Sequence, residues 1–330
     1  MALTLEEAKV GYADKVEQNV IDEFRRSSIL LDKLTFDDTI SPTGGSNLVY
    51  GYQRLETPST AAVRQINSEY SPNEAKRTKC TASPVILGGS FQIDRVIAQT
   101  SGAINEMDFQ IKEKTKAGAN YFHNLVINGT SASTGTGYVP NTFDGLKKIL
   151  SGKSTEMKTD IDISTSALLD SNYNALLDEL DAFIALLAAK PGVIMMNSKM
   201  LTKVKSAARR AGYYDRNKDD FGRTVETYNG IILMDAGQYY NGSTTEDVVS
   251  TSTPGSDTYG TTDIYAAKLG LDAFHGISVD GSKMLKTYLP DLQAPGAVKT
   301  GEVELIAGAV LKNSKMAGVL KGIKLLGKTA

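Results

Sequence analysis

The stretch over residues 104–150 most strongly limits the folds open to this chain, because it encodes one long helix that ends and then restarts. Apolar side chains recur near one stripe of a 3.6-residue helix, at Ile104, Met107, Ile111, Phe122 and Val126. The pattern predicts a half-buried helix over about 104–127, roughly 22 residues and about 33 Å long. Asn128-Gly129 then predicts a helix stop, since both residues tolerate the left-handed conformation. A Gly/Ser/Thr loop follows, and Phe143-Asp144-Gly145-Leu146 begins the next element.

The first 45 residues predict an N-terminal arm that begins with a helix. Thr4-Leu5-Glu6-Glu7 is a capping-box pattern, in which the side chains of Thr4 and Glu7 bond to each other's backbone amides. An apolar ridge recurs every four residues, at Tyr12, Val16, Val20 and Phe24. Such a ridge needs a surface to cover, and the sequence leaves open whether that surface belongs to the same domain or to a neighbouring subunit.

Residues 46–90 predict an extended hairpin with flanking strands. Leu48, Tyr50 and Tyr52 alternate as in a strand, whereas 56–84 is polar, with only scattered apolar residues such as Val63, Ile66 and Tyr70. Ser71-Pro72-Asn73 favours a turn. We expect a long hairpin without its own core, which a partner surface would stabilise. The alternative is a disordered surface loop, although structureless loops of this length are uncommon in compact domains.

The remainder of the chain alternates strands and helices. We expect a short strand over 159–165, with Ile161 and Ile163 on one side, and a helix with a broad apolar face over 176–187. Val193-Ile194-Met195-Met196 predicts a buried strand, and Asn197 the cap of a helix that ends near Gly212. An exposed loop over 238–262 follows, then strands at 264–269 and 276–279 and closing strands within 303–326.

Two passages together resemble the major capsid proteins of tailed bacteriophages, which have the Hong Kong 97 fold. One is the long helix released through Asn-Gly, a Gly/Ser/Thr loop and Phe-Asp-Gly-Leu. The other is the order helix, Val-Ile-Met-Met-Asn, helix, Asn-Gly-Ile-Ile-Leu-Met-Asp. The resemblance implies an α+β subunit with five parts: an N-terminal arm (1–45), the hairpin called the E-loop with flanking strands (46–90), a peripheral domain with the long spine helix (91–195), an axial domain (196–300) and closing C-terminal strands (301–330).

The resemblance also implies a function. Subunits would assemble in the host cytoplasm into pentamers and hexamers of an icosahedral virion head that encloses double-stranded DNA. The implied partners are other copies of the chain, a portal protein, a scaffolding protein and a decoration protein, with only weak non-specific contact to DNA. Candidate inter-subunit contacts are Tyr12, Val16, Val20, Phe24, Val63, Ile66, Tyr70, Lys76 and Lys79. In some family members a hairpin lysine forms a covalent Lys–Asn bond between subunits, and Lys76 or Lys79 could do so here.

The composition argues against several other classes of protein. A net charge of −2, from 36 basic and 38 acidic residues, gives no global attraction to nucleic-acid phosphates. The single cysteine, Cys80, excludes an internal disulfide and has no second cysteine for a zinc site. No stretch approaches the ~20 apolar residues of a membrane span, and the N-terminus lacks a signal-peptide pattern. We therefore expect a protein that is neither exported nor embedded in a membrane.

Catalytic motifs are also missing from the sequence. The two histidines, His123 and His275, fall on different predicted elements, and no pair of His or Cys residues has metal-ligand spacing. The stretch 276–283 looks like a phosphate loop but has Gly-Ser-Lys where Gly-Lys-Ser/Thr is needed. We expect no enzyme activity, cofactor or metal. Two alternatives stay open: an encapsulin-type nanocompartment shell with the same fold, and an α/β enzyme suggested by the strand–helix alternation over 174–235.

Overall fold

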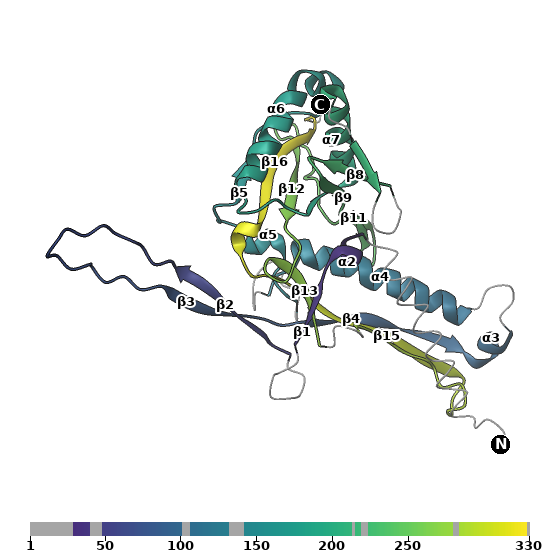
Figure 1. Cartoon of the computed structure of the whole chain (residues 1–330). Coiled ribbons are helices and arrows are strands. Elements are labelled where there is room, and N and C mark those ends of the chain that lie inside the picture. Colours follow the sequence, from purple (N-terminus) through teal and green to yellow (C-terminus); the bar gives the residue numbers. More distant parts are fainter. Residues whose placement is uncertain are drawn as a thin grey trace.

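The computed structural model describes residues 29–39, 48–100, 106–131, 142–212, 215–218, 224–279 and 284–328 of the 330. It has two lobes and a hairpin that projects from them (Figure 1). A lower lobe places the long helix α4 (Glu106–Asn128) against a sheet, and an upper lobe places α6 (Ser166–Ala185) and α7 (Ser198–Ala211) on a second sheet. The helix predicted near the N-terminus lies outside the described residues.

The lower sheet has five strands, in the order β1-β13-β15-β14, with β4 also paired to β15. Its strands are β1 (Phe36–Asp38), β4 (Val85–Asp94), β13 (Phe274–Ser278), β14 (Leu285–Tyr288) and β15 (Val298–Leu311). β4 and β15 form a long antiparallel ladder, from Val298 opposite Asp94 to Ala307 opposite Val85. The predicted strand pieces on either side of Gly88-Gly89 are therefore one strand. Ile111, Phe122 and Val126 of α4 are buried in the core beside this sheet, which confirms the predicted apolar stripe.

The helix predicted over about 104–127 is α4, and it ends where the sequence indicated but for another physical reason. Gly129 does not have a positive φ, so the expected left-handed stop is wrong. Instead the chain packs tightly here: the Gly145 amide donates to the Gly129 carbonyl at 2.8 Å. A Cβ atom added to Gly129 would lie 2.4 Å from the Phe143 carbonyl oxygen, and one added to Gly145 would lie 2.6 Å from the Ile127 oxygen. Glycine is needed for close approach of two backbones.

The upper sheet has seven strands, in the order β5-β16-β12-β6-β9-β8-β7. They are β5 (Glu156–Lys158), β6 (Val193–Met196), β7 (Asp215–Lys218), β8 (Thr224–Tyr228), β9 (Ile231–Asp235), β12 (Gly260–Ala267) and β16 (Ala317–Leu326). Only β5–β16 and β6–β9 pair in parallel. Helix α6 contacts β16 and helix α7 contacts β9, so the two helices cover one face of this sheet side by side.

The seven-stranded sheet is a wall shared by two hydrophobic cores. Along β6, Val193 and Met195 pack into the core that contains α4, whereas Ile194 and Met196 pack into the core beneath α6 and α7. The same alternation continues on β16, where Val319 faces the first core and Leu320 the second. A strand buried on both faces must be apolar at every position, which explains the run Val-Ile-Met-Met.

Helix caps form as the sequence predicted, with one addition. Asn197 caps α7, since its Oδ1 accepts from the Met200 amide at 2.8 Å, and Gly212 ends the helix with a φ of 76°. Thr165 caps α6 in the same way, accepting from the Leu168 amide at 3.2 Å. The helix therefore begins a full ten residues before the apolar face that predicted it.

Two further sequence predictions were wrong. The strand expected over 159–165 is reduced to one bridge between Asp162 and Lys324, and the pairing strand is β5, just before it. The loop expected over 238–262 contains a small hairpin, β10 (Gln238–Tyr240) with β11 (Thr245–Asp247). The short elements α2 (Ile29–Lys33), α3 (Arg95–Thr100), α5 (Leu146–Ile149) and η1 (Ser314–Met316) complete the described structure.

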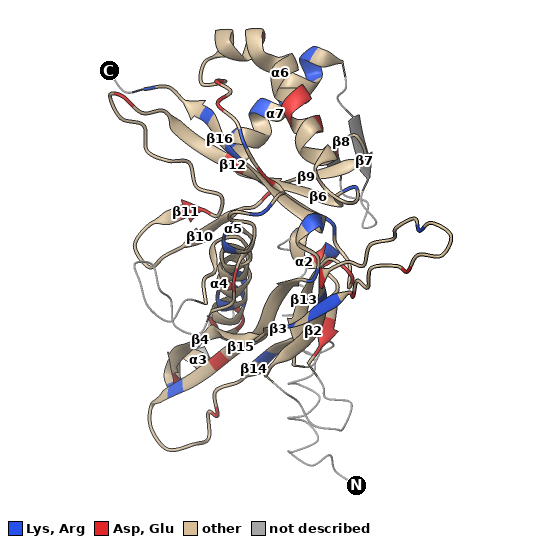
Figure 2. Ribbon diagram, turned by 90° about the vertical axis from the view of Figure 1, so that its left-hand side faces the viewer, with Lys and Arg blue, Asp and Glu red and all other residues tan. Residues whose placement is uncertain are grey.

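The five-part division of the chain stays a prediction. The predicted boundary at 195/196 would separate α6 from α7, yet these helices pack together above one core. Basic and acidic residues are interspersed over both lobes, in keeping with the balanced charge (Figure 2). Among the described residues, no helix combines the length and apolar character that crossing a bilayer requires.

Candidate inter-subunit surface

The candidate site is the hairpin of β2 (Tyr50–Thr57) and β3 (Lys76–Ala82), which stands away from both lobes (Figure 1). Among the described residues the two strands pair only with each other, from Tyr50 opposite Ala82 to Thr57 opposite Lys76. Residues 58–75 complete the tip without regular strand pairing and are exposed throughout. An isolated two-stranded hairpin is only marginally stable in water. Contact with a further surface would therefore stabilise this hairpin.

The hairpin tip carries the apolar residues that the sequence singled out. Val63 and Ile66 are 100% and 91% exposed, and Tyr70 is 58% exposed. The Arg64 guanidinium lies 5.7 Å from the centroid of the Tyr70 ring, and the Asn73 amide donates to the Thr60 hydroxyl at 2.8 Å. These contacts shape the tip, but they leave Val63 and Ile66 without cover.

Lys76 and Lys79 are exposed on β3, on opposite faces of the strand. Lys79 lies opposite Gln53 in the ladder, and its neighbour Arg77 donates to the Gln53 side chain at 3.3 Å. Both lysine ammonium groups can therefore reach another molecule. The other predicted contacts, Tyr12, Val16, Val20 and Phe24, lie outside the described residues.

The root of the hairpin is held by side chains that sequence analysis did not identify. Arg54 donates through Nε to the Lys312 carbonyl and through Nη2 to the Leu311 carbonyl, both at 2.9 Å. Tyr50 donates its hydroxyl to the Asp37 carboxylate at 2.6 Å. Burial, reinforced by this hydrogen bond, raises the pKa of Tyr50 well above its usual value. The partners lie far apart in the chain, so no local pattern could have indicated them.

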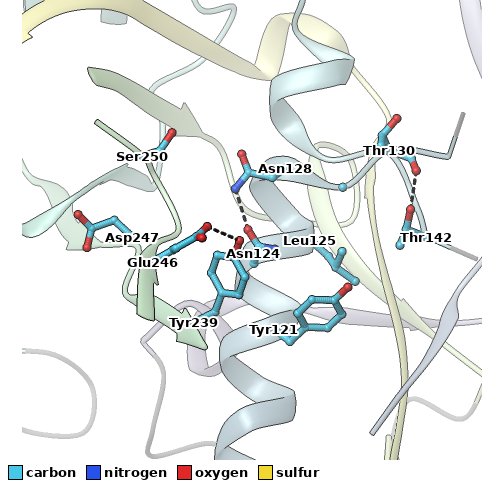
Figure 3. Close-up of a pocket in the computed structure, with 11 residues that line it drawn as sticks. Tyr121, Asn124, Leu125, Asn128, Thr130, Thr142, Tyr239, Glu246, Asp247 and Ser250 are labelled. Atoms are coloured by element: carbon cyan, nitrogen blue, oxygen red, sulfur yellow. Dashed lines mark hydrogen bonds between the residues drawn. The ribbon is translucent and has the colours of Figure 1, made fainter. Parts of the chain in front are cut away.

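A second surface feature is a cavity of about 300 Å³ between α4 and the β10–β11 hairpin (Figure 3). Tyr121 of α4 and Tyr239 of β10 lie with ring centroids 6.5 Å apart, and the Asn128 amide donates to the Val248 carbonyl at 2.8 Å. The Tyr239 hydroxyl donates to Glu246 at 2.9 Å, and burial together with this contact raises the pKa of Tyr239. The ring contact and the Asn128 bond hold the small hairpin to α4, whereas the Tyr239–Glu246 bond joins its two strands.

The described residues do not converge on a catalytic or metal centre. His123 is buried on α4, and burial lowers its pKa to about 4. His275 is buried on β13, in the lower sheet. Within the described ranges, no group of three or more His, Cys, Asp or Glu residues could hold a metal ion. Part of the phosphate-loop look-alike, 280–283, lies outside those ranges.

Comparisons with known proteins found one family model that matches part of the chain and several solved structures with the same fold. A family model described as SU10 major capsid protein matches residues 74–232, which begin in the hairpin and end in β9. No curated protein sequence matches the chain.

Solved structures share the fold at low sequence identity. An encapsulin from Synechococcus elongatus PCC 7942 has 12% identity and a TM-score of 0.63, with 91% of this chain and 89% of that chain covered. The capsid of an empty GTA particle has 12% identity and a TM-score of 0.57, with 90% of each chain covered. A chain of Mycobacterium phage Ogopogo has 12% identity and a TM-score of 0.52, with 89% and 91% covered. At such identities the likeness concerns the fold.

Proposed function

We propose that this chain is a major capsid protein of tailed-phage type with the Hong Kong 97 fold, and that its copies join as pentamers and hexamers into an icosahedral head around double-stranded DNA. The protein is a structural component of the virion capsid. Its mechanism is mechanical, because a rigid two-lobed body is held to its neighbours by an extended hairpin. Many such contacts, each modest by itself, add up through multivalency.

One observation carries the proposal, namely the exposed tip of the β2–β3 hairpin. Val63 and Ile66 are almost entirely exposed, on an element that pairs with no other strand of the described chain. Covering these side chains on a neighbouring copy would remove apolar surface from water at about 25 cal/mol per Å². The hairpin would then gain the support that its own fold lacks.

Electron microscopy of the purified protein, with sedimentation in parallel, tests the proposal. We expect closed shells whose capsomers contain five or six copies. A homogeneous monomer near 35.4 kDa at concentrations well above micromolar would contradict it. A variant that lacks residues 58–75 should keep the two lobes folded but lose the shells.

An encapsulin-type shell is the alternative with the same fold. The family match over 74–232 favours the phage capsid. Protein mass spectrometry together with a nucleic-acid assay, both on particles from the native source, separates the two. Packaged DNA supports a phage head, whereas a stoichiometric enzyme cargo supports a nanocompartment.

For a phage head we expect three further partners: a portal protein at one vertex, a scaffolding protein during assembly and a decoration protein on the finished shell. Contact with packaged DNA should be weak and non-specific, because the chain carries a net charge of only −2. Raising the salt concentration should therefore change DNA retention by empty shells only slightly.

A covalent bond between copies is a separate proposal for Lys76 or Lys79. Both lysines are exposed on β3, where an asparagine of a neighbouring copy could approach. Assembled particles boiled in detergent would show oligomer bands on a denaturing gel if such a bond forms. Migration only as monomer would exclude it, and Lys76→Arg compared with Lys79→Arg would identify the lysine.

A further inference from the structure

The buried imidazole of His275 lies at the place where the projecting hairpin joins the body. His275 is on β13, opposite Val310 of β15, and its side chain is 0% exposed. Its ring meets the ring of Tyr50, the first residue of β2, edge to face at a centroid distance of 5.7 Å. Neither ring nitrogen has a partner in hydrogen-bonding geometry among the described residues. Buried polar atoms without partners are rare and costly, so a tolerated one suggests a role.

Side chains from three other parts of the chain meet around His275. Asp37 of β1 accepts the Tyr50 hydroxyl at 2.6 Å, and the Lys312 ammonium, just after β15, lies 5.3 Å from the Tyr50 ring centroid. The Lys312 carbonyl in turn accepts from Arg54 at 2.9 Å. Asp272, which precedes β13, raises the pKa of the His275 imidazole through its negative charge. Tyr50 is therefore held between a carboxylate, a cation and a neutral imidazole.

We propose that His275 is an acid-sensitive latch, which holds the root of the β2–β3 hairpin to the body while neutral and releases it when protonated. A protonated ring would place a charge in a buried site without water, next to the Lys312 ammonium. The Asp37 carboxylate, whose charge favours the imidazolium, already accepts the Tyr50 hydroxyl. The Tyr50 ring lies against the imidazole, so bringing water to the imidazolium requires Tyr50, the first residue of β2, to move away from the body.

The electrostatics agree with this geometry. Burial lowers the pKa of His275, and Lys312 lowers it further, whereas Asp37, Asp272 and the Ala273 carbonyl act in the opposite direction. A histidine whose pKa is lowered in the held state binds a proton more readily once released. The held state is therefore fully favoured above about pH 6.5 and loses stability as the pH falls through that value.

Linkage sets the size of the expected effect. If the released imidazole has a pKa of ~6.5, the ratio of released to held hairpin can rise by at most roughly 30-fold between pH 7.5 and pH 5. The proposal concerns a single copy, so it is tested on unassembled subunits. Its failure would leave shell assembly, and with it the proposed function, untouched.

Hydrogen–deuterium exchange of the full chain, corrected for intrinsic rates, tests the latch. The released hairpin is marginal by itself, so we expect exchange of the amides of 50–57 and 76–82 to rise about tenfold or more from pH 7.5 to pH 5, while α6 and β12 stay protected. His275→Phe, which keeps a ring but binds no proton, should remove the rise. His123→Gln, at the other buried histidine, should leave it unchanged.

Two results would overturn the latch: a hairpin whose corrected exchange is the same at both pH values, or a His275→Phe variant that keeps the rise. If His275→Phe does not fold, the wild type still decides the question. Hairpin exchange must increase at a higher pH than that at which the two lobes open, and a single common transition would contradict the proposal.

Discussion

At the scale of single residues, the hairpin depends on a few long-range bonds at its root. Arg54 donates to the carbonyls of Leu311 and Lys312, some 257 residues away in the chain. Hydrogen bonds from charged groups typically contribute ~1.5–3 kcal/mol each when buried, and less when half-exposed as here. The hairpin has no core of its own, so these bonds decide how firmly it is held.

We predict that Arg54→Ala loosens the hairpin without unfolding the body. A loss of about 1.4 kcal/mol at the root corresponds to ~10-fold faster exchange of the amides of 50–57. Arg64→Ala is the matched control, because Arg64 lies at the tip over Tyr70 and not at the root. Equal exchange in the Arg54 and Arg64 variants would show that the root bonds do not hold the hairpin.

A second residue-scale prediction concerns His123 and acid stability. Burial lowers the pKa of His123 to about 4, so its proton binds more tightly to the unfolded chain, where the pKa is ~6.5. The stability present above pH 6.5 is therefore lost as the pH falls towards 4, by up to about 3 kcal/mol. Urea unfolding of His123→Gln at several pH values should show a flatter dependence between pH 6.5 and 4. A slope as steep as that of the wild type would contradict this.

At the scale of elements, replacing two glycines on or next to the long helix by alanine should change the stability of the protein in opposite directions. A Cβ atom added to Gly118 would have no neighbouring atom within 4 Å. Gly118→Ala should therefore stabilise α4 by about 0.5–1 kcal/mol, through helix propensity alone. Gly129→Ala would place its Cβ 2.4 Å from the Phe143 oxygen and 2.5 Å from the Leu125 oxygen. We expect a loss of ~2 kcal/mol or more, since backbone atoms on both sides must shift. Thermal unfolding of both variants tests the contrast, and a stable Gly129→Ala protein would refute the close approach.

Most elements could be predicted from local sequence patterns, because these elements depend on residues that are close together in the chain. The Asn197 cap and the alternating burial of Val193–Met196 are examples. The β10–β11 hairpin was missed although Asn241-Gly242, a favoured hairpin turn, stands between its strands, with Gly242 at a φ of 100°. The strand expected over 159–165 was wrong because pairing with β16 starts earlier, at Glu156 opposite Val319, and alternation alone cannot fix a register.

The candidate site shows where local patterns stop being informative. Exposure of Val63 and Ile66 agrees with a hairpin that lacks its own core, which the polar composition of 56–84 predicted. The residues that fasten the hairpin were not predictable. Asp37, Tyr50 and His275 come from three separate strands, and only the fold brings them together.

At the scale of the whole molecule, the seven-stranded sheet joins the two lobes. Its strands contribute side chains to both cores, so the lobes share one wall instead of meeting across a flexible linker. In a subunit built in this way, packing on both faces of one sheet ties the lobes together, while the hairpin reaches outward. Rigidity of the body and reach of the hairpin are the two properties that a shell subunit needs.

The last prediction follows from that arrangement, because the tip should matter for assembly and not for folding. Val63→Ser combined with Ile66→Ser removes apolar area that is almost fully exposed in the single copy, so the unfolding temperature of the subunit should stay unchanged. If a neighbour covers both side chains, the loss is about 2 kcal/mol per copy, which raises the critical concentration for assembly roughly 30-fold. Light scattering against protein concentration measures this. Gln65→Ser is the control, because it shortens a polar side chain at the same tip and should assemble like the wild type. If the double-serine variant also assembled like the wild type, no neighbour would cover the tip.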